Sequence, residues 1–290
     1  MSTPVIDCIG DVWKRRLSNS GFAEQPGGSY RPDSTSWAVI ALKSAAMSSE
    51  IINAARNQLR EGQAEDGRVS IPGNPGVFWP TPLAILAWHG SKQHQEAEKR
   101  AIRFLLEMEG SHWKKKKDTT VAHDTALRGW PWTEFTHSWI EPTVLALIAL
   151  EITGHTAHQR FGEGIRMIMD RQLPHGGWNY GNTLVYGQEL HPFIDTTGLA
   201  LNAVAGHVKK EDVNLSIQLL KNRVEQCRTP LSLGWALFGL GSWGEFPKKG
   251  HVWIEESLKR QENYGAYGTS LLSLLVLASI CQGNFRKCFA

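Results

Sequence analysis

Three carboxyl side chains stand at equivalent places in a repeated pattern of this sequence. Asp33, Glu141 and Asp195 each lie two residues before a threonine that opens an apolar segment. An acid at the start of a helix commonly caps it, because its oxygens accept hydrogen bonds from the free backbone N–H groups of the first turn. A buried acid also resists ionisation and keeps a proton that it can donate. The three residues are therefore candidates for acid–base chemistry as well as for helix capping.

Large aromatic side chains lie on or just before the same apolar segments. Tryptophan is frequent, with 12 copies in 290 residues. Such rings bury large areas and present an electron-rich face, so they either fill a core or line a cavity. The candidates for a cavity lining are Trp37, Trp79, Trp88, Trp139, Phe193 and Trp235.

The apolar segments that carry these residues recur along the chain. Each is apolar nearly all round, which is typical of a helix buried on both sides. The segments between them, such as residues 213–224, have an apolar stripe at spacings of three and four and a polar opposite face. That spacing predicts amphipathic helices with one solvated face. The apolar copies begin at Thr35, Thr81, Thr143, Thr197, near Leu231 and at Thr269.

This alternation predicts an all-α fold, namely an (α/α)6 toroid with six buried inner helices and six amphipathic outer helices. Residues 9–17 are expected to form an outer helix beside the last repeat, and we expect a single domain over residues 1–290. If all inner helices point the same way, their N-termini meet at one end of a central cavity. The three acids would then meet there as well.

A second motif precedes the fourth apolar copy. Gln172, Gly176 and Trp178 form a Gln-x-x-x-Gly-x-Trp run, and a version with Tyr in place of Trp begins at Gln261. Together with the threonine segments, these residues resemble the squalene–hopene cyclase and protein prenyltransferase β-subunit superfamily over about residues 25–280. The resemblance implies an (α/α)6 toroid, and we assign the Gln-x-x-x-Gly-x-Trp run to stability rather than to chemistry.

The resemblance also singles out one of the acids. In the cyclases of this superfamily that protonate an alkene, the motif is Asp-x-Asp-Asp-Thr-Ala, and its middle Asp donates the proton. Asp195 matches that donor and Thr197 matches the threonine, whereas Phe193 and Thr196 replace the flanking acids. The resemblance thus implies that Asp195 donates a proton to a carbon–carbon double bond.

Such a reaction makes specific demands on its surroundings. The carbocation needs a dry lining of aromatic faces, and a helix N-terminus stabilises the carboxylate that is left behind. Glu141 or Asp33 would assist Asp195, and His191 is a candidate hydrogen-bond partner that would modify its acidity. The predicted function is a small class II, that is protonation-initiated, terpene cyclase-like enzyme. Its ligand would be an isoprenoid or other apolar small molecule in a central apolar cavity.

Two other interpretations stay open. The chain could be a non-catalytic toroid that binds an isoprenoid, a lipid or a protein, with the acids serving only as helix caps. It could also be an (α/α)6 enzyme of another class, such as a glycosidase that uses a carboxylate pair. The prenyltransferase branch of the superfamily holds zinc with an Asp-x-Cys pair, which this sequence lacks, so we expect no metal and no cofactor.

Composition limits the partners. The formal charge of +3 is nearly balanced, so no nucleic-acid partner is expected. The cysteines show no Cys-x-x-Cys spacing and no signal peptide precedes them, which favours reduced thiols and a cytoplasmic location. The lysines at 114–117 and Cys288 near the end leave a peripheral membrane contact open, and a partner domain or a homo-oligomer is equally open.

Overall fold

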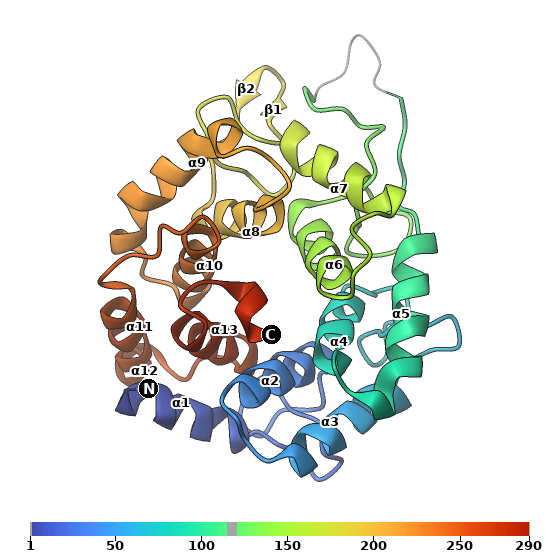
Figure 1. The fold of residues 1–290 in the computed structure, drawn as a ribbon, viewed down its shortest axis with the longest axis vertical. Coiled ribbons are helices and arrows are strands. Elements are labelled where there is room, and N and C mark those ends of the chain that lie inside the picture. The colour runs from blue at the N-terminus through green and yellow to red at the C-terminus, as the bar shows by residue number, and fades with distance from the viewer. Residues whose placement is uncertain (1, 115–120, 290) are drawn as a thin grey trace.

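A computed structural model describes residues 2–114 and 121–289. The described chain is mainly helical, as the sequence predicted, and Figure 1 shows its helices in an inner and an outer layer. The only strands in the described residues form a two-stranded antiparallel hairpin, β1 (Leu184–Val185) and β2 (Gln188–Glu189). Lys115, Lys116 and Lys117 of the basic run lie outside the described residues.

The inner helices coincide with the apolar copies. Successive members contact each other, and the last one contacts the first, so the inner layer closes on itself (Figure 1). Nearly every residue of these helices is buried, because each packs against inner neighbours on its flanks and against an outer helix behind it. The inner helices are α2 (Pro32–Ser44), α4 (Pro80–Trp88), α6 (Ile140–Ile152), α8 (Ile194–Val204), α10 (Pro230–Gly241) and α13 (Thr269–Ile280).

The outer helices bury one face each and follow the amphipathic segments. Their apolar stripes pack against the inner helix that precedes them in the chain, as α9 packs on α8. The N-terminal helix lies beside α13 and α11, as expected, but it spans residues 3–13 rather than 9–17. Pro4 starts it early, and residues 16–22 turn back in an isolated bridge. The outer helices are α1 (Thr3–Trp13), α3 (Ser49–Glu61), α5 (Gln95–Glu107), α7 (Gln159–Asp170), α9 (Lys210–Arg223) and α11 (Gly250–Lys259).

Short helical turns complete the chain. They lie between the longer helices or after the last one, where the backbone changes direction. These elements are η1 (Lys92–His94), η2 (Val224–Gln226), α12 (Gln261–Tyr264) and η3 (Phe285–Cys288).

The repeated threonine explains how each inner helix is fixed in place. The Thr143 hydroxyl accepts a hydrogen bond from the backbone N–H of Trp130 at 2.9 Å, and all of these groups are buried. The preceding segment is thereby fastened to the first turn of the inner helix, and a buried N–H is satisfied. The same bond joins Phe22 N to Thr35 (2.9 Å), Val69 N to Thr81 (2.9 Å) and Trp178 N to Thr197 (3.1 Å).

The tryptophan of the Gln-x-x-x-Gly-x-Trp run joins the segment before α8 to the outer helix α7. Trp178 is fully buried, and its indole Nε1 donates to the carbonyl of Ile168 near the end of α7 at 2.7 Å. Gln172 donates to the hydroxyl of Ser216 on α9 at 2.8 Å. The motif therefore links an inner helix to two outer helices, which is a structural role.

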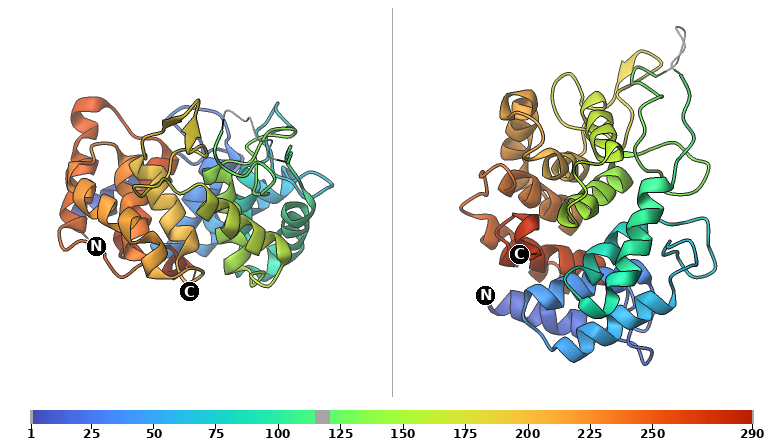
Figure 2. Two further views of the ribbon diagram at one scale, coloured as in Figure 1. Left: turned by 90° about the horizontal axis from the view of Figure 1, so that it is seen from above. Right: turned by 45° about the vertical axis from the view of Figure 1, so that its right-hand side comes forward.

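The C-terminal segment lies inside the inner layer, at its far end. Figure 2 (left) shows the C-terminus on the face opposite to the β1–β2 hairpin. Arg286 of η3 forms a two-pronged ion pair with Glu151 of α6, with distances of 2.8 and 2.7 Å. The ring of Phe285 lies 6.0 Å from that of Trp37 and 5.9 Å from that of Trp235, centroid to centroid. The segment therefore forms a floor beneath these two tryptophans.

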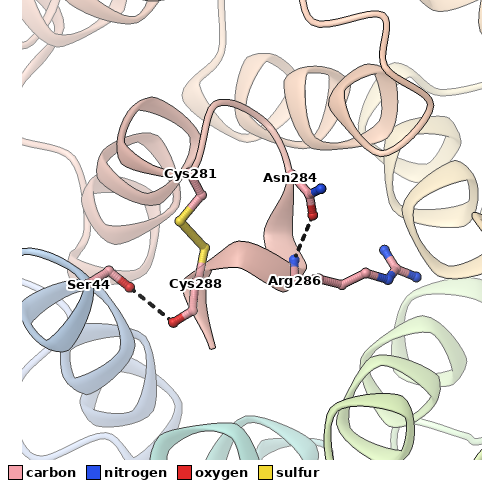
Figure 3. The surroundings of a disulfide bond; sticks show 5 residues. All are labelled: Ser44, Cys281, Asn284, Arg286 and Cys288. Atoms are coloured by element: carbon pink, nitrogen blue, oxygen red, sulfur yellow. Dashed lines mark hydrogen bonds between the residues drawn. A yellow bond between two sulfur atoms is a disulfide. The ribbon is translucent and has the colours of Figure 1, made fainter. Parts of the chain in front are cut away.

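A disulfide fixes this floor. Cys281, which ends α13, is bonded to Cys288, the last residue of η3 (Figure 3). The Ser44 hydroxyl at the end of α2 donates to the carbonyl of Cys288 at 3.4 Å. The expectation that all cysteines are reduced is therefore wrong at this pair. The sequence spacing gave no sign of it, because the turn that brings the two thiols together is formed by η3.

Candidate functional site

A cavity of 260 Å³ opens among the N-terminal ends of the inner helices. Three larger surface hollows, around residues 62–76, beside α5, and around Ser2 and His251, contain none of the predicted site residues. The cavity wall combines charged groups, tryptophan rings and aliphatic side chains. It consists of Glu24, Arg31, Asp33, Trp37, Trp79, Leu83, Glu141, Leu145, Leu231, Trp235, Ser270, Leu271 and Leu274.

Equivalent positions of different helices meet at this cavity. Asp33 and Glu141 are each the second residue of their helix, as are Leu231 and Ser270. Because the inner helices start at the same end, the second residues of these four helices face one space. The predicted acids Asp33 and Glu141 and the predicted aromatics Trp37, Trp79 and Trp235 are thus brought together.

Asp33 is committed to an ion pair. Its two carboxylate oxygens accept hydrogen bonds from Nε and Nη2 of Arg31, both at 2.9 Å, and the residue is buried. The same bond raises the pKa of Arg31 above its usual value. Both oxygens of Asp33 are thus occupied by one guanidinium, which gives this residue a structural partner that Glu141 lacks.

Glu141 is the opposite case. Its side chain faces the cavity, and no described residue gives it a hydrogen bond or an ion pair. Burial raises its pKa from 4.5 to about 7, and the negative charge of Asp195 adds to the effect. A carboxyl with this pKa is protonated about half the time at neutral pH, as a general acid should be.

Asp195 lies beside this site rather than in the cavity wall. It is the second residue of α8 and is partly exposed. Burial raises its pKa, whereas its own backbone N–H and that of Thr196 lower it by hydrogen bonding to the carboxylate. Burial raises the pKa of Cys227 to about 11, and the negative charge of Asp195 adds to the effect, so Asp195 acts electrostatically on Cys227 as well as on Glu141.

The remaining predicted aromatics lie away from the cavity. Trp88 is completely buried, and its Nε1 donates to the carbonyl of Arg56 at 3.1 Å, which makes it a link between α3 and α4. Trp139 caps the start of α6 beside Gly181. Phe193 is at the surface, stacked on Tyr180 at 4.6 Å between ring centroids.

His191 is exposed on the segment that leads to α8. Its carbonyl accepts a hydrogen bond from the Asn179 side chain at 2.7 Å. In the part of the chain that the structure describes, no hydrogen bond or ion pair joins its imidazole to Asp195. The structure therefore gives no support to the prediction that His191 modifies the acidity of Asp195.

Two charged wall residues were not predicted from the sequence. Glu24 accepts hydrogen bonds from the hydroxyls of Ser34 and Ser270, at 2.7 and 2.8 Å, and from the backbone N–H of Ser270 at 3.2 Å. Arg31 pairs with Asp33 as described. Both lie on the loop before α2, outside any repeat, and the partner Ser270 is 246 residues away in the chain. The sequence held no signal of this contact.

Among the described residues, no group of three or more His, Cys, Asp and Glu side chains is placed to hold a metal ion. Within the same ranges, no helix combines the length and apolar character needed to cross a bilayer.

The comparisons with known proteins bear on the fold alone. No protein-family model matches the chain, and no curated protein matches it. A solved structure of a protein from Actinoplanes is similar over 99% of both chains, with a TM-score of 0.59 and 13% sequence identity. The likeness supports the helical architecture and carries no statement about activity.

Proposed function

We propose that the chain is an (α/α)6 toroid of the cyclase type. The support is the closed order of inner-helix contacts together with the threonine bond that recurs at the start of successive inner helices. A unit that cannot bury its apolar faces alone needs neighbours on both sides, and a closed ring supplies them.

The proposed activity is protonation-initiated cyclisation of a small isoprenoid in the central cavity. One observation carries it: Glu141, a carboxyl with a pKa near 7 and no protein partner, faces a cavity that is walled by tryptophan rings. An acid of this kind retains a proton for transfer to a double bond. The N-terminal turn of α6 then stabilises the carboxylate that forms.

We assign the proton transfer to Glu141 and a supporting role to Asp195. The superfamily motif points to Asp195 as the donor, but of these two acids it is Glu141 that lines the cavity. The negative charge of Asp195 helps Glu141 to stay protonated until the substrate is bound. Trp37, Trp79 and Trp235 would stabilise the carbocation through their ring faces, at about 0.5–2 kcal/mol each.

The cavity sets a limit on the substrate. Its 260 Å³ is just below the roughly 300–1,000 Å³ of pockets for drug-sized ligands. A short isoprenoid therefore suits it better than a triterpene precursor such as squalene. The C-terminal floor beneath Trp37 and Trp235 closes the far end and prevents a longer chain from passing through.

A non-catalytic binding role is the alternative, and one observation favours it. Asp33 is held by Arg31, and Glu24 is held by Ser34 and Ser270. Both acids act as structural links, although Asp33 pairs with a guanidinium and does not cap α2. A cyclase would convert a bound polyene to a cyclic product, whereas a binding protein would release it unchanged.

The experiment is a product analysis. The purified protein is incubated with geraniol, farnesol, farnesyl diphosphate and squalene, and the extracts are analysed for cyclised hydrocarbons and alcohols. The cyclase proposal expects product from a short polyene in the wild type and none in Glu141→Gln. Binding of a polyene without any product would support the non-catalytic alternative instead.

A further inference from the structure

The cavity wall presents electron-rich faces rather than a plain aliphatic surface. Trp37 and Trp235 lie edge to face, with ring centroids 6.0 Å apart and an interplanar angle of 70°. Trp79 adds a third indole from the start of α4 and packs edge to face on Trp132. Such faces attract cations, most strongly where water is excluded.

The charged groups at the cavity mouth are balanced, with the exception of Glu141. Asp33 is neutralised by Arg31. Glu24 accepts hydrogen bonds from Ser34 and Ser270, and the buried guanidinium of Arg15 lies beside it and donates to its main-chain carbonyl at 3.2 Å. The carboxylate form of Glu141 is therefore the charge in the wall that has no opposite partner among the described residues. An anionic head group such as a diphosphate would meet repulsion from it.

Glu141 lacks the partner that the other wall acids have. Its carboxyl faces the cavity with no hydrogen bond and no ion pair from any described residue. Glu141 is partly buried, and a carboxylate that is partly withdrawn from water is stabilised by a paired charge. A positive charge inside the cavity would supply the missing partner.

We propose that this cavity binds a small organic cation, an amine or quaternary ammonium with apolar substituents, and that Glu141 is its counter-ion. The apolar groups would contact the leucines of the wall, and the charge would lie among the indole faces next to Glu141. The inference rests on the cavity being the binding site of the proposed function, but it does not require that the protein be a cyclase.

Binding of a cation would be coupled to a proton. The charged groups that face Glu141 are Glu24, Arg31 and Asp33 in the wall and Asp195 on α8, while α4, α10 and α13 contribute no titratable group to the wall. The pKa of Glu141 is about 7 in the free protein, and a bound cation lowers it. Affinity for the cation should therefore rise with pH, by up to about tenfold between pH 6 and pH 8.

Calorimetry with matched probes tests this inference. Choline and its uncharged isostere 3,3-dimethylbutan-1-ol have the same shape and differ in charge, and benzyltrimethylammonium adds apolar area. The proposal expects both cations to bind at least tenfold more tightly than the isostere at pH 8. It also expects proton release on binding, seen as a dependence of the heat on the buffer. Geranyl diphosphate should bind more weakly than geraniol.

Variants separate the counter-ion from the fold. Glu141→Gln should weaken cation binding at pH 8 by at least tenfold and remove its pH dependence, with geraniol binding unchanged. Glu225→Gln, an exposed carboxylate of η2, is the matched control and should bind as the wild type does. Equal binding of choline and its isostere, or cation binding that survives in Glu141→Gln, would overturn the proposal. Formation of cyclised products is scored separately, so either proposal can fail without the other.

Discussion

Glu141 and Asp195 occupy the same position, the second residue, of the neighbouring helices α6 and α8, and the charge of Asp195 helps to raise the pKa of Glu141. The superfamily motif placed the acid at Asp195. Both side chains are partly exposed, but Glu141 lines the cavity and Asp195 does not. The two acids thus have unequal environments on equivalent turns, which separates their roles.

The raised pKa of Glu141 makes folding stability depend on pH. The unfolded chain releases this proton near pH 4.5, whereas the folded chain keeps it until about pH 7. The contribution is therefore fully present below pH 4.5 and is lost as the pH rises towards 7. Relative to Glu141→Gln, which does not titrate, the wild type should lose up to about 3 kcal/mol of unfolding free energy between pH 4.5 and pH 7.

Urea unfolding of both proteins at several pH values measures this difference. Asp195→Asn should reduce the loss of unfolding free energy, because it removes the negative charge that helps to raise the pKa of Glu141. A constant difference between wild type and Glu141→Gln from pH 4 to pH 8 would show that the pKa of Glu141 is not raised.

The repeated threonine bond is predicted to be a stability element. Thr143→Val keeps the shape of the side chain but leaves the buried N–H of Trp130 without its acceptor. The expected cost is about 1–3 kcal/mol of unfolding free energy. Thr136→Val makes the same chemical change at an exposed site, where water replaces the lost bond, and should change little. Denaturant unfolding compares the two, and equal effects would count against the role of the bond.

Gly198 lets α8 approach α10. A side-chain carbon at this position would collide with the backbone carbonyl of Trp235 and crowd the N–H of Ala236. Since backbone cannot move aside cheaply, Gly198→Ala should cost about 1–3 kcal/mol or more. Gly162→Ala on α7 meets nothing within 4 Å and should be neutral or stabilising by up to about 1 kcal/mol. Thermal unfolding of both variants checks the contrast, and a neutral Gly198→Ala would contradict the close approach.

The disulfide should stabilise the C-terminal floor. The bond between Cys281 and Cys288 closes a short loop, and the chain-entropy model gives about 2–3 kcal/mol for a loop of this length. The double Cys→Ser variant at these positions should lose that amount, while Cys227→Ser, a free thiol, should lose little. A thiol titration in denaturant without reductant should find only Cys8 and Cys227 reactive. Four reactive thiols would disprove the bond.

The helices of the fold were predictable because their signal is local. A segment of this length that is apolar nearly all round favours a buried helix, and α6 is buried over most of its length. Helix bounds were less certain, since α1 depends on Pro4 at its start rather than on its apolar stripe. The Cys281–Cys288 bond was not predicted. The short helix η3 brings the two thiols together, and η3 has no apolar periodicity from which it could be predicted.

The site was predictable only where residues belong to the repeat. Asp33 and Glu141 were found because each opens an inner helix, and the cavity indeed contains both. Glu24 and Arg31 lie on a loop, and Glu24 contacts Ser270, which is far away in the sequence. Their place in the cavity wall could therefore be found only from the folded structure. The difference in pKa behaviour between the acids depends on burial and partners, which sequence spacing does not encode.

The most direct measurement of the central claim is isotope incorporation in deuterated water. A proton that Glu141 exchanges with solvent and delivers to a polyene should appear as one deuterium at the protonated carbon of a cyclised product. We predict this label in the wild type, a large loss of product in Asp195→Asn, and no product in a folded Glu141→Gln. Unlabelled product, or labelled product that persists in Glu141→Gln, would contradict the assignment of Glu141 as the proton donor.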